Sequence, residues 1–165
     1  FTVTFNNNNS ASIIERTSSI NSEDESTQQR LRFYKHSLDQ TFKNPIIGVG
    51  LGNWKIKSVD YDKEDVVGYT IPYHTHNDFL EISSELGIIG LSLYLLIFIF
   101  PFLEILKDKD SEKLININTI ILLAGIVYFV DANLNFPHAR PVMQIPFILI
   151  LVIAFAKNNN KLKDA

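Results

Sequence analysis

Three apolar runs in the second half of the sequence constrain its fold more than any other feature. Residues 86–103 are 18 consecutive positions without a charge, about the length that a helix needs to cross the hydrocarbon core of a bilayer. Residues 114–130 form a run of 17 diluted by asparagine and threonine, and residues 142–156 form a run of 15 that contains a proline. The sequence therefore predicts an all-α integral membrane protein with two to three transmembrane helices, at about residues 86–106, 114–134 and 142–156.

The alternative interpretation of these runs is a buried helical core in a soluble protein. The second half of the chain has too little polar sequence to cover such a core, so we favour the membrane. A formal net charge of −3 offers no basic face for a phosphate backbone, which argues against nucleic acid as a partner. The chain has no cysteine, so disulfides and cysteine-ligated metals are both excluded.

The chain begins at Phe1, without a methionine and without a visible signal peptide. We therefore expect it to be the C-terminal piece of a longer protein. Residues 1–27 are rich in asparagine, serine, threonine and glutamate, which predicts a solvated, flexible loop.

Basic residues in short connecting segments set the orientation of membrane helices. Residues 107–113 and the tail 157–165 each contain three lysines. With three spans, both segments lie on one side of the membrane, which should be cytoplasmic. Residues 1–85 and the short segment 135–141 then share the external side. We therefore expect five basic side chains to meet on that face: Arg30, His74, His76, His138 and Arg140.

Residues 28–43 have the periodicity of an amphipathic helix. Its apolar face is expected to carry Leu31, Tyr34, Leu38 and Phe42. At about 100° per residue, Arg30 lies at the border of this face and Arg32 nearly opposite, so we expect Arg30 to look toward the packed side. The helix should end at Asn44, because the residue before a proline is pushed out of the α region.

The next segment, residues 45–54, carries alternating glycines at Gly48, Gly50 and Gly52. One interpretation is a phosphate-binding loop, but the Lys-Ser/Thr pair of such a loop is missing and the spacing is not that of a dinucleotide fingerprint. The other is a turn in which glycine supplies a positive φ or lets two backbones approach closely. We favour the turn and keep Gly48 and Gly50 as candidate substrate-binding residues.

The polar stretch before the first apolar run crowds two histidines, an amide and two carboxylates together. Asp78 followed by Glu81 resembles a capping box that opens a helix, and Thr75 with Asp78 gives a competing register. In either register His76 and Asn77 lie at a helix N-terminus, where partial positive charge and unpaired N–H groups suit an anion.

This stretch allows a metal site, a helix cap alone, or a catalytic site. A metal held by His74 and His76 would need a third ligand, such as Asp78, and an open position. We favour a catalytic or substrate-binding role without metal, because histidine suits general-base chemistry near neutral pH and arginines are expected on the same side. Arg140, between two prolines at the membrane edge, either anchors the chain to lipid phosphate or contacts the substrate.

Two motifs stand in a fixed order along the chain. The first is Arg30-x-x-x-Tyr34, followed by Asn44-Pro45-x-x-Gly48-x-Gly50-x-Gly52-Asn53-Trp54. The second is His76-Asn77, nine residues, and then Gly87-x-x-Gly90-Leu91. Together they resemble the O-antigen ligase and O-antigen polymerase superfamily of bacterial envelope glycosyltransferases, over about residues 28–105. The family often has tryptophan where Tyr34 stands.

The resemblance implies the C-terminal transmembrane helices of a multi-pass protein of the bacterial inner membrane, preceded by a large, mostly helical or irregular periplasmic loop. It implies transfer, without metal, ATP or another cofactor, of a glycan from a polyprenyl diphosphate-linked donor to a glycan, lipid A-core or protein acceptor. The family's catalytic arginine and histidine map onto Arg30 and His76, and a further arginine would lie upstream of Phe1. The resemblance leaves substrate contacts or orienting roles to His74, Asn77, Asp78 and Arg140.

Within this superfamily the sequence does not separate a ligase from a polysaccharide polymerase or a protein O-oligosaccharyltransferase, because these differ in the acceptor. An alternative of another class is a membrane scaffold or transporter subunit without catalytic activity. Charges in the middle of a span would support transport, and the predicted spans contain none.

Overall fold

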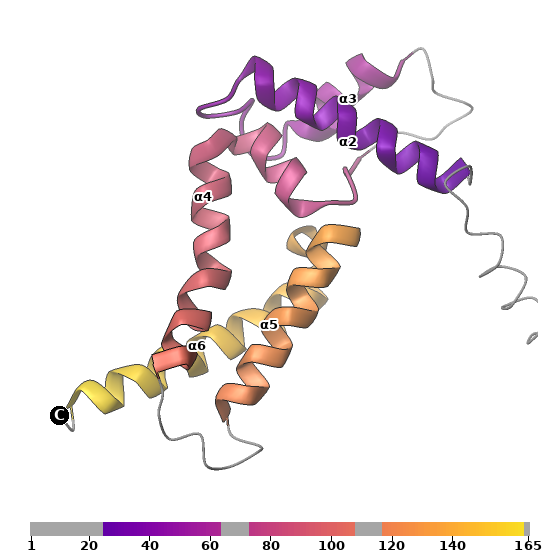
Figure 1. Cartoon of the computed structure of the whole chain (residues 1–165). Helices are drawn as coiled ribbons and strands as arrows, with labels where there is room; N and C mark the ends of the chain where they lie inside the picture. The colour runs from indigo at the N-terminus through magenta and orange to yellow at the C-terminus, as the bar shows by residue number, and fades with distance from the viewer. Residues whose placement is uncertain (1–24, 64–72, 108–116, 164–165) are drawn as a thin grey trace, which may run out of the picture. The chain divides into compact units, whose positions relative to one another are not determined.

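A computed structural model of the chain describes residues 25–63, 73–107 and 117–163, and every regular element in that part is helical (Figure 1). The elements are α2 (Glu25–Lys43), α3 (Trp54–Asp62), α4 (Asp78–Lys107), α5 (Ile117–Leu134), a 3-10 turn η1 (Pro137–Ala139) and α6 (Pro141–Lys163). Residues 1–32 and 33–165 form two separate compact units. Most of the predicted flexible loop, the lysine segment after residue 107 and the last two residues lie outside the described residues.

The apolar helices bear out the predicted all-helical fold, with one difference in length. Asp78–Leu103, 26 residues, is long and apolar enough to cross a membrane, whereas the apolar parts of α5 and α6 are shorter, at Thr119–Leu134 and Pro141–Ala156. Only 11% of the most apolar window of the first helix is buried, which argues against the core of a soluble protein. Pro141 at the first helical position starts α6 without losing a hydrogen bond.

Helices α4, α5 and α6 pack against one another. Aromatic rings fill their contact: Tyr128 and Phe147 stack with centroids 4.0 Å apart, and Phe98 lies 5.7 Å from Phe147. Tyr128 and Phe147 are buried, whereas most other apolar side chains of these helices are exposed. The aromatic contacts join three helices that the sequence shows only as separate runs.

Helix α2 covers the predicted residues 28–43, but the predicted packed face is wrong. Leu38 and Phe42 are 40% and 77% exposed, and the buried positions are instead Phe33, Ser37 and Gln40. The reason is that this part of α2 packs on the polar start of α4. Its contacts are hydrogen bonds, from Ser37 Oγ to the Leu80 carbonyl at 2.7 Å and between the hydroxyls of Thr41 and Ser83 at 3.0 Å.

Helix α4 bends sharply at Gly87, which has φ 64° and ψ −160° (Figure 1). The carbonyls of Ser84 and Glu85, released by the bend, accept hydrogen bonds from the amides of Val49 and Gly50 at 3.1 and 2.7 Å. Beyond the bend, the Ile88 amide donates to the Pro45 carbonyl at 2.8 Å. The turn at 45–50 therefore satisfies the backbone groups that the bend leaves open. The span predicted from residue 86 did not include this bend.

Glycine is required on both sides of this crossing. A Cβ atom on Gly48 would overlap the backbone carbonyl of Glu85, and one on Gly87 would overlap that of Ile46. Gly48, Gly50 and Gly52 also have positive φ, of 63°, 101° and 75°. The interpretation of this segment as a turn with close backbone approach is confirmed.

The start of α3 is fastened to the same bend. The backbone amide of Trp54 donates to Glu85 Oε1 at 2.9 Å, and the indole is fully buried. Glu85 thus holds the first turn of α3 with its side chain while its carbonyl accepts from the glycine turn. The bend positions the polar start of α4 on one side and the apolar continuation on the other.

Candidate functional site

The polar start of α4 is capped by Asn77. Its side-chain Oδ1 accepts from the Leu80 amide at 3.1 Å, as an N-cap residue does. Both predicted capping registers are wrong, because the carboxylate of Glu81 accepts from the Thr75 amide at 2.8 Å and does not return to Asp78. The placement of His76 and Asn77 at the helix N-terminus is confirmed.

His76 has a backbone conformation that distinguishes it from the rest of the site. Its φ is 59°, and within residues 25–63, 73–107 and 117–163 no other non-glycine residue has a positive φ. This left-handed conformation costs about 1–2 kcal/mol for a residue with a side chain. The Tyr34 hydroxyl donates to the His76 carbonyl at 3.1 Å, and the imidazole lies edge-on to Phe136 at 5.1 Å. These contacts hold the residue in its strained state.

His74 is oriented by a buried carboxylate. Its Nδ1 lies 2.9 Å from Glu81 Oε1, and Glu81 is only 3% exposed. The imidazole stacks on Phe136 with centroids 4.2 Å apart and planes 12° apart. A histidine whose Nδ1 is bonded to a carboxylate keeps one tautomer and one ring orientation, the arrangement of a general base.

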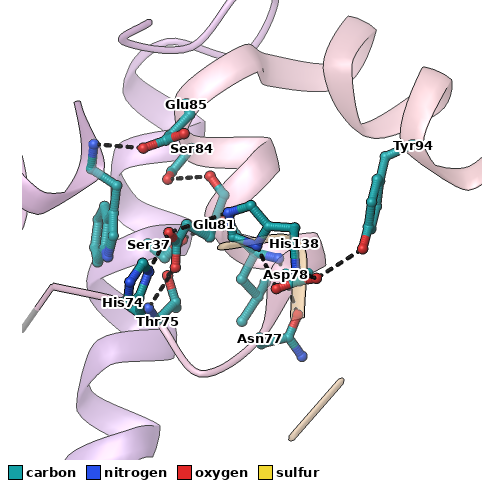
Figure 2. Close-up of polar contacts among 12 residues, drawn as sticks. Ser37, His74, Thr75, Asn77, Asp78, Glu81, Ser84, Glu85, Tyr94 and His138 are labelled. Atoms are coloured by element: carbon teal, nitrogen blue, oxygen red, sulfur yellow. Dashed lines mark hydrogen bonds and ion pairs between the residues drawn. The ribbon is translucent and has the colours of Figure 1, made fainter. Parts of the chain in front are cut away.

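A second histidine–carboxylate pair joins the segment before α6 to α4 (Figure 2). His138 Nδ1 lies 2.6 Å from Asp78 Oδ1, and the His138 amide donates to Asp78 Oδ2 at 3.1 Å. The Tyr94 hydroxyl donates to the same Oδ2 at 2.8 Å. Asp78 is fully buried, with both oxygens bonded to protein donors, so it positions its neighbours and does not itself face a substrate.

The charges around His138 determine its protonation. Burial of the imidazole lowers the pKa of His138, but the hydrogen bond to Asp78 and the charges of Asp78, Glu81 and Glu85 outweigh it. The net result is a pKa above the ordinary value for histidine. Sequence reasoning expected His138 near the other histidines but did not pair it with Asp78, 60 residues away.

The segment between α5 and α6 also brings Arg140 and Phe136 to the site. The Arg140 guanidinium lies over the Phe136 ring at 4.1 Å, a cation–π contact. Asp131, near the end of α5, accepts a hydrogen bond from the side-chain amide of Asn135 at 2.6 Å. Three predicted side chains therefore contact Phe136, a residue that sequence reasoning missed: His74, His76 and Arg140. His138 lies edge-on to His74, with ring centroids 6.3 Å apart.

Three further residues were predicted to belong to the site, namely Arg30, Gly48 and Gly50. Arg30 lies in the part of α2 that belongs to the unit of residues 1–32. The amides of Gly48 and Gly50 donate to the carbonyls of Asn44 and Glu85, at 3.0 and 2.7 Å. Neither amide is therefore open to a phosphate, and both glycines serve the turn.

A metal site, one of the alternatives that the sequence allows, requires several ligands arranged around one ion. In the described part of the chain, no group of three or more histidine, aspartate or glutamate side chains is arranged to hold a metal ion. Two of the histidines, His74 and His138, use their Nδ1 atoms on Glu81 and Asp78. The arrangement resembles two oriented imidazoles more than a ligand set.

Comparison with known proteins gives a family and several relatives. The family model for O-antigen ligase matches residues 1–95. A protein named "putative polysaccharide ligase" from Rickettsia conorii is 30% identical over 115 residues, which are 67% of this chain and 27% of that protein. Proteins with the same description from Rickettsia typhi and Rickettsia prowazekii are 30% and 27% identical, over 78% of this chain and 32% of each relative. The chain thus spans about a third of the length of these relatives, and no solved structure matches it.

Proposed function

This chain belongs to the O-antigen ligase family, and from that premise we propose that it forms part of an enzyme that transfers a glycan at the periplasmic face of the bacterial inner membrane. The donor is a glycan on a polyprenyl diphosphate lipid. The acceptor is a hydroxyl or amino group of a lipid A-core, a growing glycan or a protein. Residues 1–85 are periplasmic, α4 to α6 supply membrane-spanning segments, and the tail from 157 is cytoplasmic.

The observation that carries the catalytic assignment is the strained backbone of His76. Conformations that cost free energy persist where the surrounding structure enforces them, and they gather at functional sites. Here Tyr34 and Phe136 enforce the conformation from two other segments of the chain. The strain supports His76 as the residue that meets the reacting hydroxyl.

The chemistry requires one proton acceptor and fixed positive charge. The acceptor hydroxyl loses its proton to the His76 imidazole as its oxygen attacks the sugar C1 carbon. The bond from C1 to the diphosphate oxygen breaks, and the electron pair leaves with the diphosphate. Arg30 and Arg140 stabilise this departing charge as guanidinium donors, so that neither a metal nor a cofactor is needed. Arg30 precedes Tyr34 by four residues in α2, which is one helical turn.

His74 and its partner Glu81 support this step. The carboxylate fixes the His74 ring, which then binds a sugar hydroxyl or, as the competing assignment, acts as the base itself. Asn77 and Asp78 hold the cap and the His138 segment in place. Separate substitutions of His74 and His76 therefore decide which of the two acts as the base.

The test is the substitution of His76 by glycine in the full-length protein, assayed with a lipid-linked glycan donor. Glycine removes the imidazole but accepts a positive φ, so thermal stability should be unchanged or higher. Transfer should fall by about 10²–10⁴-fold, the usual contribution of a general base. His74→Ala is the matched variant, since it keeps His76 and should cost less.

Full activity of the His76→Gly protein would remove the base assignment. If His74→Ala then abolished transfer, the base would be the His74–Glu81 pair. The acceptor is decided separately in a deletion strain. Loss of long glycan from the outer envelope with polymer remaining on the carrier lipid identifies a ligase, short glycans identify a polymerase, and loss of glycoprotein staining identifies protein transfer.

A further inference from the structure

An exposed apolar patch lies on the glycine turn, away from the histidine cluster. It consists of Ile46, Ile47 and Leu51, which are 62%, 71% and 73% exposed; we refer to them as the turn patch. Three large aliphatic side chains at the tip of one short turn are unusual on a surface that faces water. Backbone hydrogen bonds join the turn to α4 at Pro45, Ile46, Val49 and Gly50, so the patch lies on a segment that is fastened to α4.

The position of the turn patch along α4 is set by backbone hydrogen bonds. The amides of Ile88 and Ile89 donate to the carbonyls of Pro45 and Ile46, at 2.8 and 3.5 Å. Ile88 and Ile89 are the first residues of the straight apolar part of α4 beyond the bend, and both are exposed. From Ile88 to Leu103 this part is about 24 Å long, most of the thickness of a bilayer's hydrocarbon core. The turn patch therefore lies level with the outer end of the apolar span.

Two positively charged side chains follow the turn patch along the chain. Lys55 and Lys57, in the first turn of α3, are both exposed and come directly after the apolar turn. Lysines beside an apolar tip are the arrangement found where side chains enter lipid, because the ammonium groups reach the anionic headgroups. An apolar tip covered by another protein segment would not call for a cationic border.

We propose that the turn patch inserts into the acyl chains of the outer leaflet, so that the glycine turn is a membrane anchor beside α4. Its occupant is lipid, with Lys55 and Lys57 at the level of the headgroups. The anchor holds the bend of α4 at a constant depth and thereby fixes the height of the site above the bilayer. This inference goes beyond the proposed glycan transfer and does not depend on the role of His76.

The test measures the depth of the turn patch in vesicles of phosphatidylethanolamine and phosphatidylglycerol that contain the full-length protein. This chain has no cysteine of its own, so the substitution Ile47→Cys introduces one labelling site in it for an environment-sensitive fluorophore. Any cysteine elsewhere in the full-length protein is first replaced by serine. Ile89→Cys provides a label at the start of the span, and Asp60→Cys a label on an exposed polar position of α3.

The expected result is that brominated lipids quench the label at position 47 as strongly as the label at 89, whereas iodide in the buffer quenches only the label at 60. Quenching of position 47 by iodide would overturn the proposal, because the turn would face water. Protection from both quenchers would also overturn it, because another protein segment would then cover the patch. Leu51→Cys repeats the measurement if Ile47→Cys does not fold, and every readout is independent of glycan transfer.

Discussion

The crossing between the glycine turn and the bend of α4 makes a quantitative prediction about Gly87. Alanine there would place a Cβ 2.6 Å from the Ile47 nitrogen and in overlap with the Ile46 carbonyl. It would also force a side chain into a φ, ψ combination that is essentially restricted to glycine, at about 1–3 kcal/mol. Overpacking against a backbone that cannot move aside adds about 1–3 kcal/mol. Gly87→Ala should therefore destabilise the protein by about 2–6 kcal/mol.

Two other glycines separate these contributions. Gly52 has a φ of 75°, but no atom lies within 4 Å of the position that a Cβ would occupy, so Gly52→Ala should cost only the conformational part, about 1–2 kcal/mol. Gly125 lies inside α5 with open space around it, so Gly125→Ala should be neutral or stabilise by about 0.5–1 kcal/mol. From the most to the least stable protein, the expected order is Gly125→Ala, wild type, Gly52→Ala and Gly87→Ala.

The assay is the thermal unfolding midpoint of the full-length protein in detergent micelles, read from the folded fraction that remains monodisperse. A Gly87→Ala protein as stable as Gly52→Ala would refute the reasoning, because the crossing would then relax freely. Combining Gly87→Ala with Gly48→Ala adds a second check. The double variant should lose less than the sum of the single losses, because both Cβ atoms open the same crossing.

Three further substitutions test the polar start of α4. The native pKa of His138 is raised, so its stabilisation is fully present below about pH 6.5 and is lost as the pH rises through the native pKa. The difference in unfolding midpoint between wild type and His138→Gln should therefore shrink with rising pH, and a difference that grows would contradict this. Asn77→Ala removes the cap and should cost about 1 kcal/mol by thermal unfolding, whereas Asn77→Ser, which keeps a capping oxygen, should cost less. Tyr94→Phe deletes the donor to the buried Asp78 carboxylate and should cost about 1.5–3 kcal/mol, and an unchanged midpoint would show that this bond is dispensable.

The apolar helices of the fold were predictable because an uncharged run of sufficient length is a property of one local stretch. The bend at Gly87 was not, since a glycine in an apolar run is compatible with a straight helix. Only its backbone pairing with the turn around Gly48, 39 positions earlier, fixes the break. The alternating glycines predicted that another backbone approaches the turn closely, but they did not indicate that this backbone is the bend of α4.

The packed face of α2 was predicted incorrectly for a related reason. Hydrophobic periodicity identifies the buried side of a helix when its partner is apolar. The partners here are polar: Ser37 donates to the Leu80 carbonyl at the start of α4, and Gln40 accepts from the Tyr61 hydroxyl of α3. Ser37 and Gln40 are therefore buried, whereas Phe42 is exposed. At the site, charge asymmetry brought the histidines and Arg140 to one side, but topology carries no information on individual pairs such as His138 with Asp78.

The hydrogen bonds across the bend of α4 run from main chain to main chain, and this has a consequence for how such proteins diverge. Only the glycines at the crossing and the proline that ends α2 are constrained by it, while neighbouring side chains contribute nothing to its hydrogen bonds. Mutations can therefore change the side chains on the exposed surfaces around the crossing without moving His76. A relative at 30% identity can therefore keep the same backbone crossing with different surface side chains.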